Sequence, residues 1–211
     1  MRAVTSLQNN HGSRVKLGQL ADISMGHTFR SRLEAVSDGD LAVIQMKDLT
    51  DDNRLDPMAL TRIELATARP SQFVTPGDIL FRSRGQTNTA VLVDEDPGRA
   101  IVAAPLLRLR PREGVIPAYL AWFINLPATQ SRLARRAEGT ALRMIRKQSL
   151  AELEVILPSL ARQQAIVELS DLAAREQQLM ARLSARRKQY MDNMLIKFAS
   201  SGLQTDSEEA H

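Results

Sequence analysis

The sequence predicts an α+β protein in which a β-rich domain over residues 13–158 precedes one long helix over residues 159–198. Short apolar runs separated by turn residues fill the stretch from Arg14 to Asp94, a pattern typical of strands and turns. Beyond Pro158 no glycine or proline occurs before Gly202, so no helix-breaking residue interrupts this stretch. These observations predict a chain of two parts, a β-rich domain followed by one long helix.

The strands of the domain are expected where short apolar runs meet turn residues. The turn Thr75–Asp78, with the sequence Thr-Pro-Gly-Asp, precedes one such run. A second turn, Asp96-Pro97-Gly98, separates two later runs. The expected strands are residues 15–17, 41–46, 79–81, 90–93, 101–102 and 106–109.

From Pro117 onward the pattern becomes helical. Residues 118–124 predict a buried helix with Pro117 in its first turn, and its aromatic residues are expected in the core rather than stacking on bases. A second helix, basic on one face, is expected from Pro127 to Arg136. Residues 149–157 predict a helical turn followed by a strand over residues 153–157.

The C-terminal helix is of the coiled-coil type and needs a partner. At 1.5 Å per residue, about 40 uninterrupted residues extend roughly 60 Å, further than the preceding domain can cover. We therefore expect pairing with a second copy, although a helix folded back on its own domain is the alternative. Segment 1–12 is expected to be flexible and the acidic tail 199–211 disordered. The apolar seam consists of Leu169, Leu172, Leu179, Leu183, Tyr190 and Met194.

Composition argues for binding rather than catalysis. The chain is 44% hydrophobic and 25% charged, and its longest nearly uncharged run, residues 115–126, is too short to span a membrane. We expect a soluble, cytoplasmic protein that has no membrane partner. The chain has no cysteine, which excludes thiol chemistry and cysteine-bound zinc. It has only three histidines, which argues against a histidine-rich metal site or a Ser/His/Asp triad. No phosphate-binding loop or dinucleotide motif occurs, and we expect no cofactor.

Most of the basic residues are arginine. Of the 28 Lys and Arg residues, five are lysine and the remaining 23 are arginine. Arginine makes planar bidentate contacts with phosphate and with guanine edges, which lysine cannot. The composition therefore suggests DNA as a partner, although a genome that prefers arginine codons would produce the same bias.

The loop that follows the run 79–81 has the side chains for reading base pairs. Arginine can donate to guanine, and glutamine and asparagine can pair with adenine. An ordinary polar hairpin is the alternative interpretation. The candidate residues of this loop are Arg82, Arg84, Gln86 and Asn88.

A dense basic cluster lies between Gln130 and Lys147, where six cations accompany one acid, Glu138. Such a cluster is suited to neutralising phosphates, which positions a protein on DNA without reading its sequence. A solvated helix face would account for some of these residues. The cluster consists of Arg132, Arg135, Arg136, Arg143, Arg146 and Lys147.

One enzymatic alternative is a Mg²⁺-dependent nuclease. Asp40, Gln45 and Lys47 have a spacing like that of a nuclease core. That chemistry needs carboxylates gathered around the metal ion, and only Asp48 or Asp78 could join Asp40.

Four motifs occur in the same order as in a known family. They are a glycine-bearing segment (Ile23–Gly26), a Gly-Asp-Ile-Leu turn before a basic glycine loop (Gly77–Gly85), a Glu-Gly-Thr stretch (Glu138–Thr140) and a helix start with paired glutamines (Leu157–Val167). The layout resembles the specificity subunit of type I restriction–modification systems from about Arg14 to Phe198. One departure is Arg162, where the family commonly has an acidic residue before the paired glutamines.

The resemblance implies a subunit that recognises DNA and has no catalysis of its own. Full-length subunits carry two target-recognition domains and two helical regions, whereas this chain has room for one of each. It therefore implies a half-length subunit that forms a homodimer, reads a bipartite target in double-stranded DNA and positions a methyltransferase subunit, with a restriction or translocase subunit as a further partner. It also places a DNA-facing loop near Arg30 and Arg32. An autonomous dimeric DNA-binding regulator is the other alternative.

Overall fold

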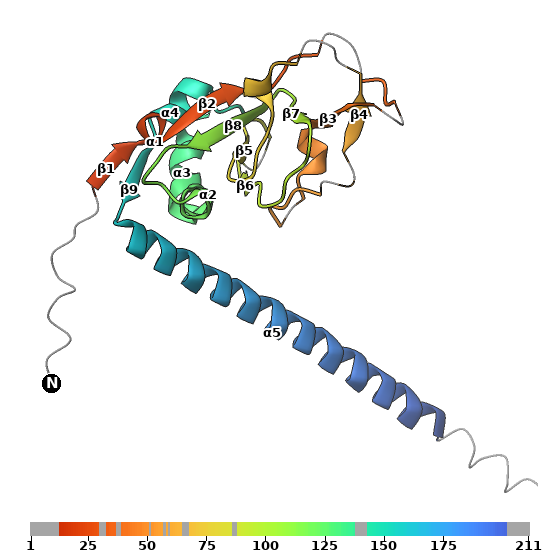
Figure 1. Ribbon diagram of the computed structural model, residues 1–211. Coiled ribbons are helices and arrows are strands. Elements are labelled where there is room, and N and C mark those ends of the chain that lie inside the picture. The colour runs from red at the N-terminus through yellow and green to blue at the C-terminus, as the bar shows by residue number, and fades with distance from the viewer. Residues whose placement is uncertain are drawn as a thin grey trace, which may run out of the picture. The chain divides into compact units, whose positions relative to one another are not determined.

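The structure is a computed structural model that describes residues 13–29, 33–36, 39–50, 52–56, 58, 60–64, 68–85, 88–137 and 143–201. The chain divides into two units, one ending at Val167 and the other beginning at Glu168. The first unit is rich in strands and the second is helical, which confirms the predicted fold class (Figure 1).

The described part of the first unit contains three sheets. The four-stranded antiparallel sheet has the order β2 (Ala21–Met25), β8 (Leu106–Pro111), β5 (Ile79–Arg82) and β6 (Ala90–Leu92). The three-stranded sheet has the order β4 (Thr61–Ile63), β3 (Leu41–Ile44) and β7 (Ala100–Val102), with β3 parallel to β7 and antiparallel to β4. In the third sheet β1 (Ser13–Lys16) pairs antiparallel with β9 (Glu154–Leu157), which joins the two ends of the domain.

The helices follow the prolines and the apolar runs of the sequence. The domain contains α1 (Leu17–Leu20), α2 (Pro117–Asn125), α3 (Pro127–Arg136), α4 (Lys147–Ala151) and the 3₁₀ turns η1 (Met46–Asp48) and η3 (Pro70–Gln72). Both α2 and α3 begin with proline, as predicted, because its fixed φ suits the first helical turn. The long helix α5 runs from Leu160 to Ser201. No helix in the described ranges combines the length and apolar character needed to cross a membrane.

Strand β5 shows why the core runs are apolar at successive positions. Ile79 and Phe81 pack with α2 in one cluster, whereas Leu80 belongs to a second cluster with residues of β3 and β7. All three side chains are fully buried. Burying a side chain of this size contributes about 1.5–3 kcal/mol. The sheet is therefore covered on both faces, with the helices on one and the three-stranded sheet on the other.

Several details of the domain differ from the prediction. Strand β3 ends at Ile44 rather than Met46, because the Gln45 backbone N–H donates to the Asp48 carboxylate at 2.8 Å and begins η1. Burial raises the pKa of Asp48. Strands β2 and β4 and the short helix α1 were not predicted, since they have only five, three and four residues; Leu17, expected in a strand, begins α1.

The turn before β5 depends on one buried carboxylate. Asp78 is 1% exposed and receives two hydrogen bonds from Arg110 on β8, each of 2.7 Å. Its Oδ2 also accepts from the Thr75 backbone N–H at 3.0 Å. These hydrogen bonds raise the pKa of the Arg110 guanidinium. The pairing fixes where β5 starts and therefore where the loop after β5 begins.

The first of the paired glutamines fastens the start of α5 to the domain. Gln163 is 0% exposed, and its Oε1 accepts from the Ile116 backbone N–H at 2.8 Å. Its Nε2 donates to the carbonyls of Gly114 at 3.1 Å and Pro158 at 2.9 Å. A buried amide with three backbone partners is expensive to leave unsatisfied, which explains a glutamine at this position.

We predict that Arg110→Met destabilises the domain strongly. It would leave the buried Asp78 carboxylate without its charged partner, a loss of about 2–4 kcal/mol in the free energy of unfolding. Urea denaturation followed by the fluorescence of the single tryptophan, Trp122, measures this loss.

The matched control is Arg112→Met, two residues along the same chain. Arg112 pairs with Asp22 at 2.5 Å, but these side chains are 53% and 71% exposed. An exposed pair contributes at most about 1 kcal/mol. Equal losses for the two variants would contradict the assigned role of Asp78.

Candidate nucleic-acid interface

The loop after β5 is held by polar side chains that point into the domain. Arg82 is 8% exposed, and its Nη2 donates to the carbonyl of Leu49 and, at 2.9 Å, to that of Thr50. Asn88 is 7% exposed and donates to the Arg82 carbonyl at 2.9 Å. Gln130 of α3 donates in turn to the Asn88 carbonyl at 2.9 Å. Both ends of the loop are therefore tied to the core.

These contacts give two of the predicted loop residues a structural role. Arg82 and Asn88 were expected to present donors to bases, and in the structure the Arg82 Nη2 and the Asn88 Nδ2 donate to backbone carbonyls inside the domain. Both residues thereby hold the loop in position. Gln86 lies outside the described residues. No sequence signal separates the two roles, because a buried arginine in a loop has the same local pattern as an exposed one.

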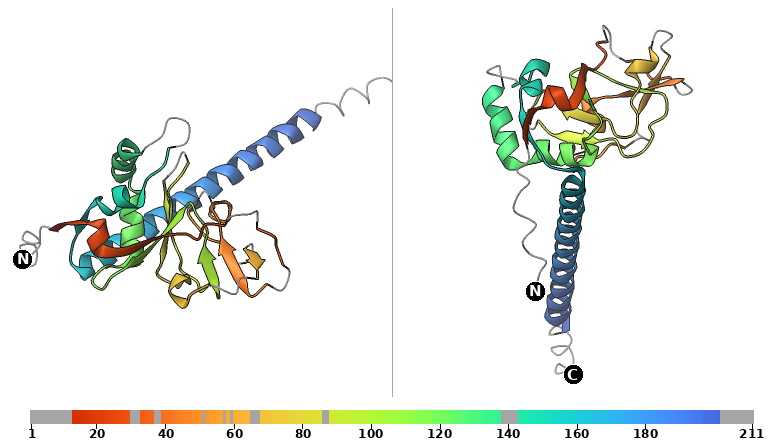
Figure 2. Two further views of the ribbon diagram at one scale, coloured as in Figure 1. Left: turned by 90° about the horizontal axis from the view of Figure 1, so that it is seen from above. Right: turned by 60° about the vertical axis from the view of Figure 1, so that its left-hand side comes forward.

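Arg84 is exposed at the surface, and its backbone pairs with a distant segment. The Ile145 N–H donates to the Ser83 carbonyl at 2.7 Å, and the Gly85 N–H donates to the Arg143 carbonyl at 3.3 Å. Arg84 and Met144 face each other in this short bridge. Gly85 has φ +119°, a value that L side chains rarely adopt. The loop after β5 and the segment that follows α3 therefore lie side by side (Figure 2).

The second segment belongs to the predicted basic cluster. Arg143 and Lys147 are exposed, as are Arg135 on α3 and Arg146 at the start of α4. Arg136 and Arg146 line one shallow pocket of about 290 Å³ together with Gln148, Ser149 and Glu152. The end of α3 and the start of α4 therefore lie next to each other around this pocket.

Arg132 differs from the rest of the cluster. Its side chain is 34% exposed, and its Nη2 lies 3.4 Å from the Glu154 carbonyl and 3.8 Å from the Glu154 carboxylate. It therefore ties α3 to the edge strand β9. A residue that already has a carboxylate partner has less to gain from a phosphate, so Arg132 is less suited than its neighbours to contact DNA.

The bridge and the pocket join the other cations into one surface, which we call the basic strip. Among the described residues, none of Arg84, Arg135, Arg143 and Lys147 forms an ion pair with a carboxylate. The one acid found in its pocket, Glu152, pairs with Lys16 at 2.6 Å. The basic strip consists of Arg84, Arg135, Arg136, Arg143, Arg146 and Lys147.

A hollow beside the loop after β5 includes the segment that follows β2. It has a volume of about 460 Å³ and is lined by residues that include Phe29, Lys47 and Pro105. Gly26 is required here, because a Cβ would lie 2.5 Å from the Ala103 carbonyl carbon. Arg30 and Arg32 lie outside the described residues. Sequence reasoning missed this hollow, because it forms between segments far apart in the chain.

The carboxylates invoked for a nuclease are each committed to a different partner. Asp40 pairs with Arg99 at 2.8 Å, Asp48 caps η1, and Asp78 is bound by Arg110. Gln45 and Lys47 both donate to the Thr61 hydroxyl, at 3.1 and 3.3 Å. In the described ranges no three His, Cys, Asp or Glu residues are grouped as a metal site would need. The nuclease alternative gains no support from these residues.

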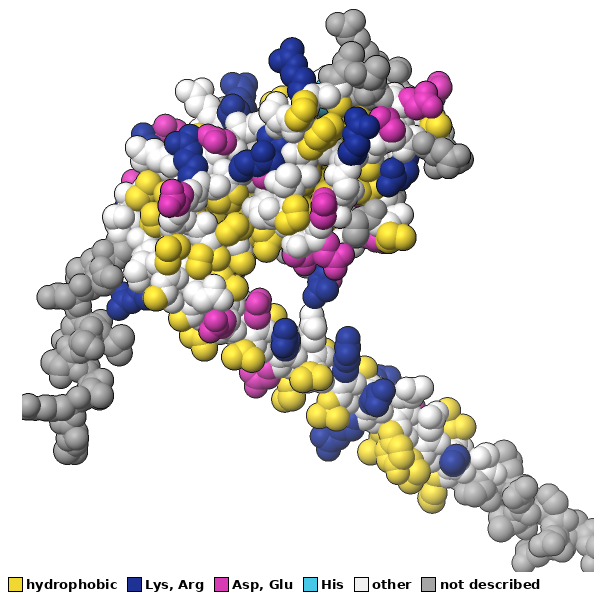
Figure 3. Space-filling model, viewed as in Figure 1, with side chains coloured by type: hydrophobic (Ala, Val, Ile, Leu, Met, Phe, Trp, Pro, Cys, Tyr) yellow, Lys and Arg dark blue, Asp and Glu magenta, His cyan; other side chains and the backbone are white. Residues whose placement is uncertain are grey.

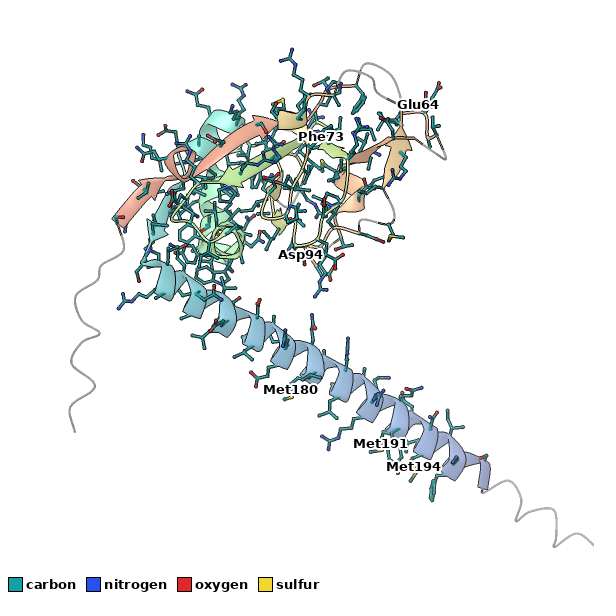
Figure 4. The ribbon with its side chains drawn as sticks, viewed as in Figure 1. Glu64, Phe73, Asp94, Met180, Met191 and Met194 are labelled. Atoms are coloured by element: carbon teal, nitrogen blue, oxygen red, sulfur yellow. The ribbon has the colours of Figure 1, made fainter. Side chains whose placement is uncertain are left out.

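The predicted seam of α5 is exposed. Its six residues are between 49% and 67% exposed, with Met194 and Leu169 at the two limits. The seam is broader than predicted, because Met180, Met191 and Phe198 are also apolar and exposed. Figure 3 shows hydrophobic side chains along the helix, and in Figure 4 the labelled Met180, Met191 and Met194 project from one side of it.

Comparisons with known proteins agree with this architecture. A chain from a structure described as "Structural basis underlying complex assembly and conformational transition of the type I R-M system" is 20% identical, with a TM-score of 0.69 over 92% of this chain and 46% of that chain. The HsdS subunit from Thermoanaerobacter tengcongensis is 20% identical, with a TM-score of 0.59 over 83% of this chain and 40% of its own.

The type I restriction–modification S subunit from M. genitalium is 19% identical, with a TM-score of 0.54 over 88% of this chain and 45% of its own. The chain thus spans less than half the length of each of these three structures. The comparison with curated protein sequences gave no match. A sequence profile described as "Type I restriction modification DNA specificity domain" matches residues 13–185, and the chain therefore belongs to this family.

Proposed function

We propose that the chain is a non-catalytic subunit that recognises a DNA sequence for a separate methyltransferase. The observation that carries the proposal is the backbone bridge between Arg84 and Met144. It places an exposed arginine on an anchored loop next to a surface of further cations. Family membership supports the same function independently.

The basic strip has the chemistry for two kinds of DNA contact. Five of its residues lie on or beside α3 and α4, where they suit phosphates and would set the position of the protein on the duplex. Arg84 lies on the loop, whose buried supports limit its freedom to move. An arginine held in this way can donate two hydrogen bonds to guanine in the major groove. Arg30, Arg32 and Gln86 remain candidates for the same role on sequence grounds.

We further propose that two copies associate through α5. The seam of α5 is apolar and exposed, and burying one leucine is worth about 1.5–3 kcal/mol. A two-fold dimer is the commonest arrangement for such a surface. It would present two recognition domains, each reading one half of a bipartite target. The length of the helices would then fix the spacing between the halves.

The partner that modifies DNA is proposed from the family. In the specificity subunits that the sequence resembles, a methyltransferase subunit docks on the helical region, and a restriction or translocase subunit can join the complex. An autonomous regulator would not retain a methyltransferase in a pull-down with the full chain as bait, which separates the two functions. Either function places the protein with the DNA, in the cytoplasm.

We predict that Arg84→Ala weakens specific binding by about 1–3 kcal/mol at a cognate duplex and has far less effect on random duplexes. Alanine keeps the backbone bridge to Met144 and removes only the side chain. Fluorescence anisotropy with both duplexes at fixed salt concentration measures the difference.

The comparison variant is Arg135→Ala with Arg136→Ala, which removes two cations of the basic strip from α3. It should weaken both duplexes alike and flatten the slope of log K against log salt by roughly 1–2 units, about 0.9 per phosphate contact. If Arg84→Ala also weakens both duplexes equally, Arg84 contacts phosphate and does not read bases.

We predict that Leu179→Asp with Leu183→Asp converts the dimer to a monomer. Two carboxylates in the seam would have to be desolvated for the helices to pair. Light scattering at micromolar concentration should give twice the mass of one chain for the wild type and the mass of one chain for the variant.

The control, Gln178→Asp with Ala185→Asp, adds the same charge on the opposite side of α5 and should leave the dimer intact. A wild-type mass equal to that of one chain would rule out self-association.

A further inference from the structure

Charged residues interrupt each column of the apolar seam of α5: Arg186 lies in the column of Leu172 and Leu179, and Glu176 and Arg187 lie in the other two columns. Glu176 lies seven residues after Leu169 and seven before Leu183, so it occupies the same heptad column as these leucines. Arg187 lies seven residues from both Met180 and Met194, in the neighbouring column. The Glu176 and Arg187 side chains are exposed in the single chain. A charge at such a position would be buried when a second helix covers the seam.

Glu176 and Arg187 cannot neutralise each other within one helix. They are 11 residues apart, which corresponds to about 16 Å along the helix axis. Among the described residues, neither has an ion-pair partner. By contrast, Lys188 and Asp192 pair locally at 3.0 Å, on the side of the helix away from the seam. The seam charges therefore require a partner from outside the chain.

The order of residues in the two columns indicates what that partner is. From the N-terminus, one column reads Leu169, Glu176, Leu183 and Tyr190. The other column, read from the C-terminus, is Met194, Arg187, Met180 and Ala173. When the two columns are aligned in this order, Leu169 and Leu183 each lie opposite a methionine and Glu176 lies opposite Arg187. The large Tyr190 lies opposite the small Ala173. A second copy of the helix running in the opposite direction supplies this complement.

We propose that Glu176 of each chain pairs with Arg187 of the other across a two-fold axis between Ala181 and Arg182, and that this pair fixes the direction and register of the two helices. The inference rests on the proposed homodimer and adds the arrangement of its helices. Residues face each other when their numbers add up to 363, so that Leu169 lies opposite Met194 of the second copy. The two-fold axis repeats each contact, giving two Glu176–Arg187 pairs.

Other arrangements leave the charges uncompensated. A parallel pairing in register places Glu176 against Glu176 and Arg187 against Arg187, which is repulsive at both levels. An antiparallel pairing shifted by one heptad sets each charge against an apolar residue. Removing the partner of a buried charge is strongly destabilising, and polar residues in a coiled-coil seam are known to specify register in this way.

Engineered thiols test the register, because the chain has no cysteine of its own. Leu169→Cys and Met194→Cys, mixed and allowed to exchange subunits, should give a covalent dimer with an oxidant or a short bis-maleimide. Neither variant alone should do so, since its two thiols would lie about 37 Å apart along the axis. A mixture of Leu169→Cys with Leu172→Cys, offset by about 33 Å, is the matched negative control.

Light scattering of the same samples before crosslinking separates the two proposals. A mass of one chain would overturn the homodimer itself and the register with it. A dimer in which each single variant crosslinks to itself would show parallel helices and overturn the register alone. A dimer in which the Leu169→Cys and Met194→Cys mixture fails to crosslink would also overturn it.

Charge exchange gives a second readout of the same pair. Glu176→Arg or Arg187→Glu alone places like charges opposite each other and should raise the dimer dissociation constant about tenfold or more. The double variant restores opposite charges only in the antiparallel arrangement and should return within about threefold of wild type. A double variant no tighter than the singles would contradict the pairing.

Discussion

The apolar seam of α5 is the constraint on which the proposed assembly of this protein depends. A helix of 42 residues places its seam on the surface, with Leu169 67% and Leu183 62% exposed. Exposing apolar side chains to water costs free energy roughly in proportion to their apolar area. In the proposed dimer a second helix covers the seam and removes this cost, and charged residues inside the seam decide which helix fits. The same surface would then both drive association and select the partner.

The β-rich domain holds both ends of the loop after β5 in place while Arg84 remains exposed. Arg82, Asn88 and Gln130 form a chain of hydrogen bonds to backbone carbonyls at the base of the loop. Polar groups are used here because loop backbone has carbonyls that no strand or helix satisfies. The resulting support leaves Arg84 as an exposed side chain on a fixed backbone. Such preorganisation lowers the entropy cost of binding.

The long helix, the first turns of α2 and α3 and most of the core strands could be predicted, because each follows from local sequence. Pro117 and Pro127 begin helices, and the turn at Gly77 precedes β5. The weak strands β2 and β4 could not be predicted, since they owe their conformation to neighbouring strands. Local pattern carries no information about such pairing.

The candidate site was predicted less completely than the fold. The exposed cations were identified, but the contact between Arg84 and Met144 joins residues 60 positions apart and has no local signature. The structural role of Arg82 and Asn88 was not predicted for a related reason. Their donors would suit a base as well as a carbonyl, and only the position of Leu49 and Thr50 in the fold decides between them.

The central claim is that two copies of this chain read one DNA target together. Selection of tight-binding duplexes from a random pool by the purified full-length protein tests it most directly. The account predicts two short half-sites in inverted orientation, separated by a gap of fixed length, with binding lost when the gap is changed by two base pairs. A single uninterrupted site, or half-sites tolerated at any spacing, would contradict it.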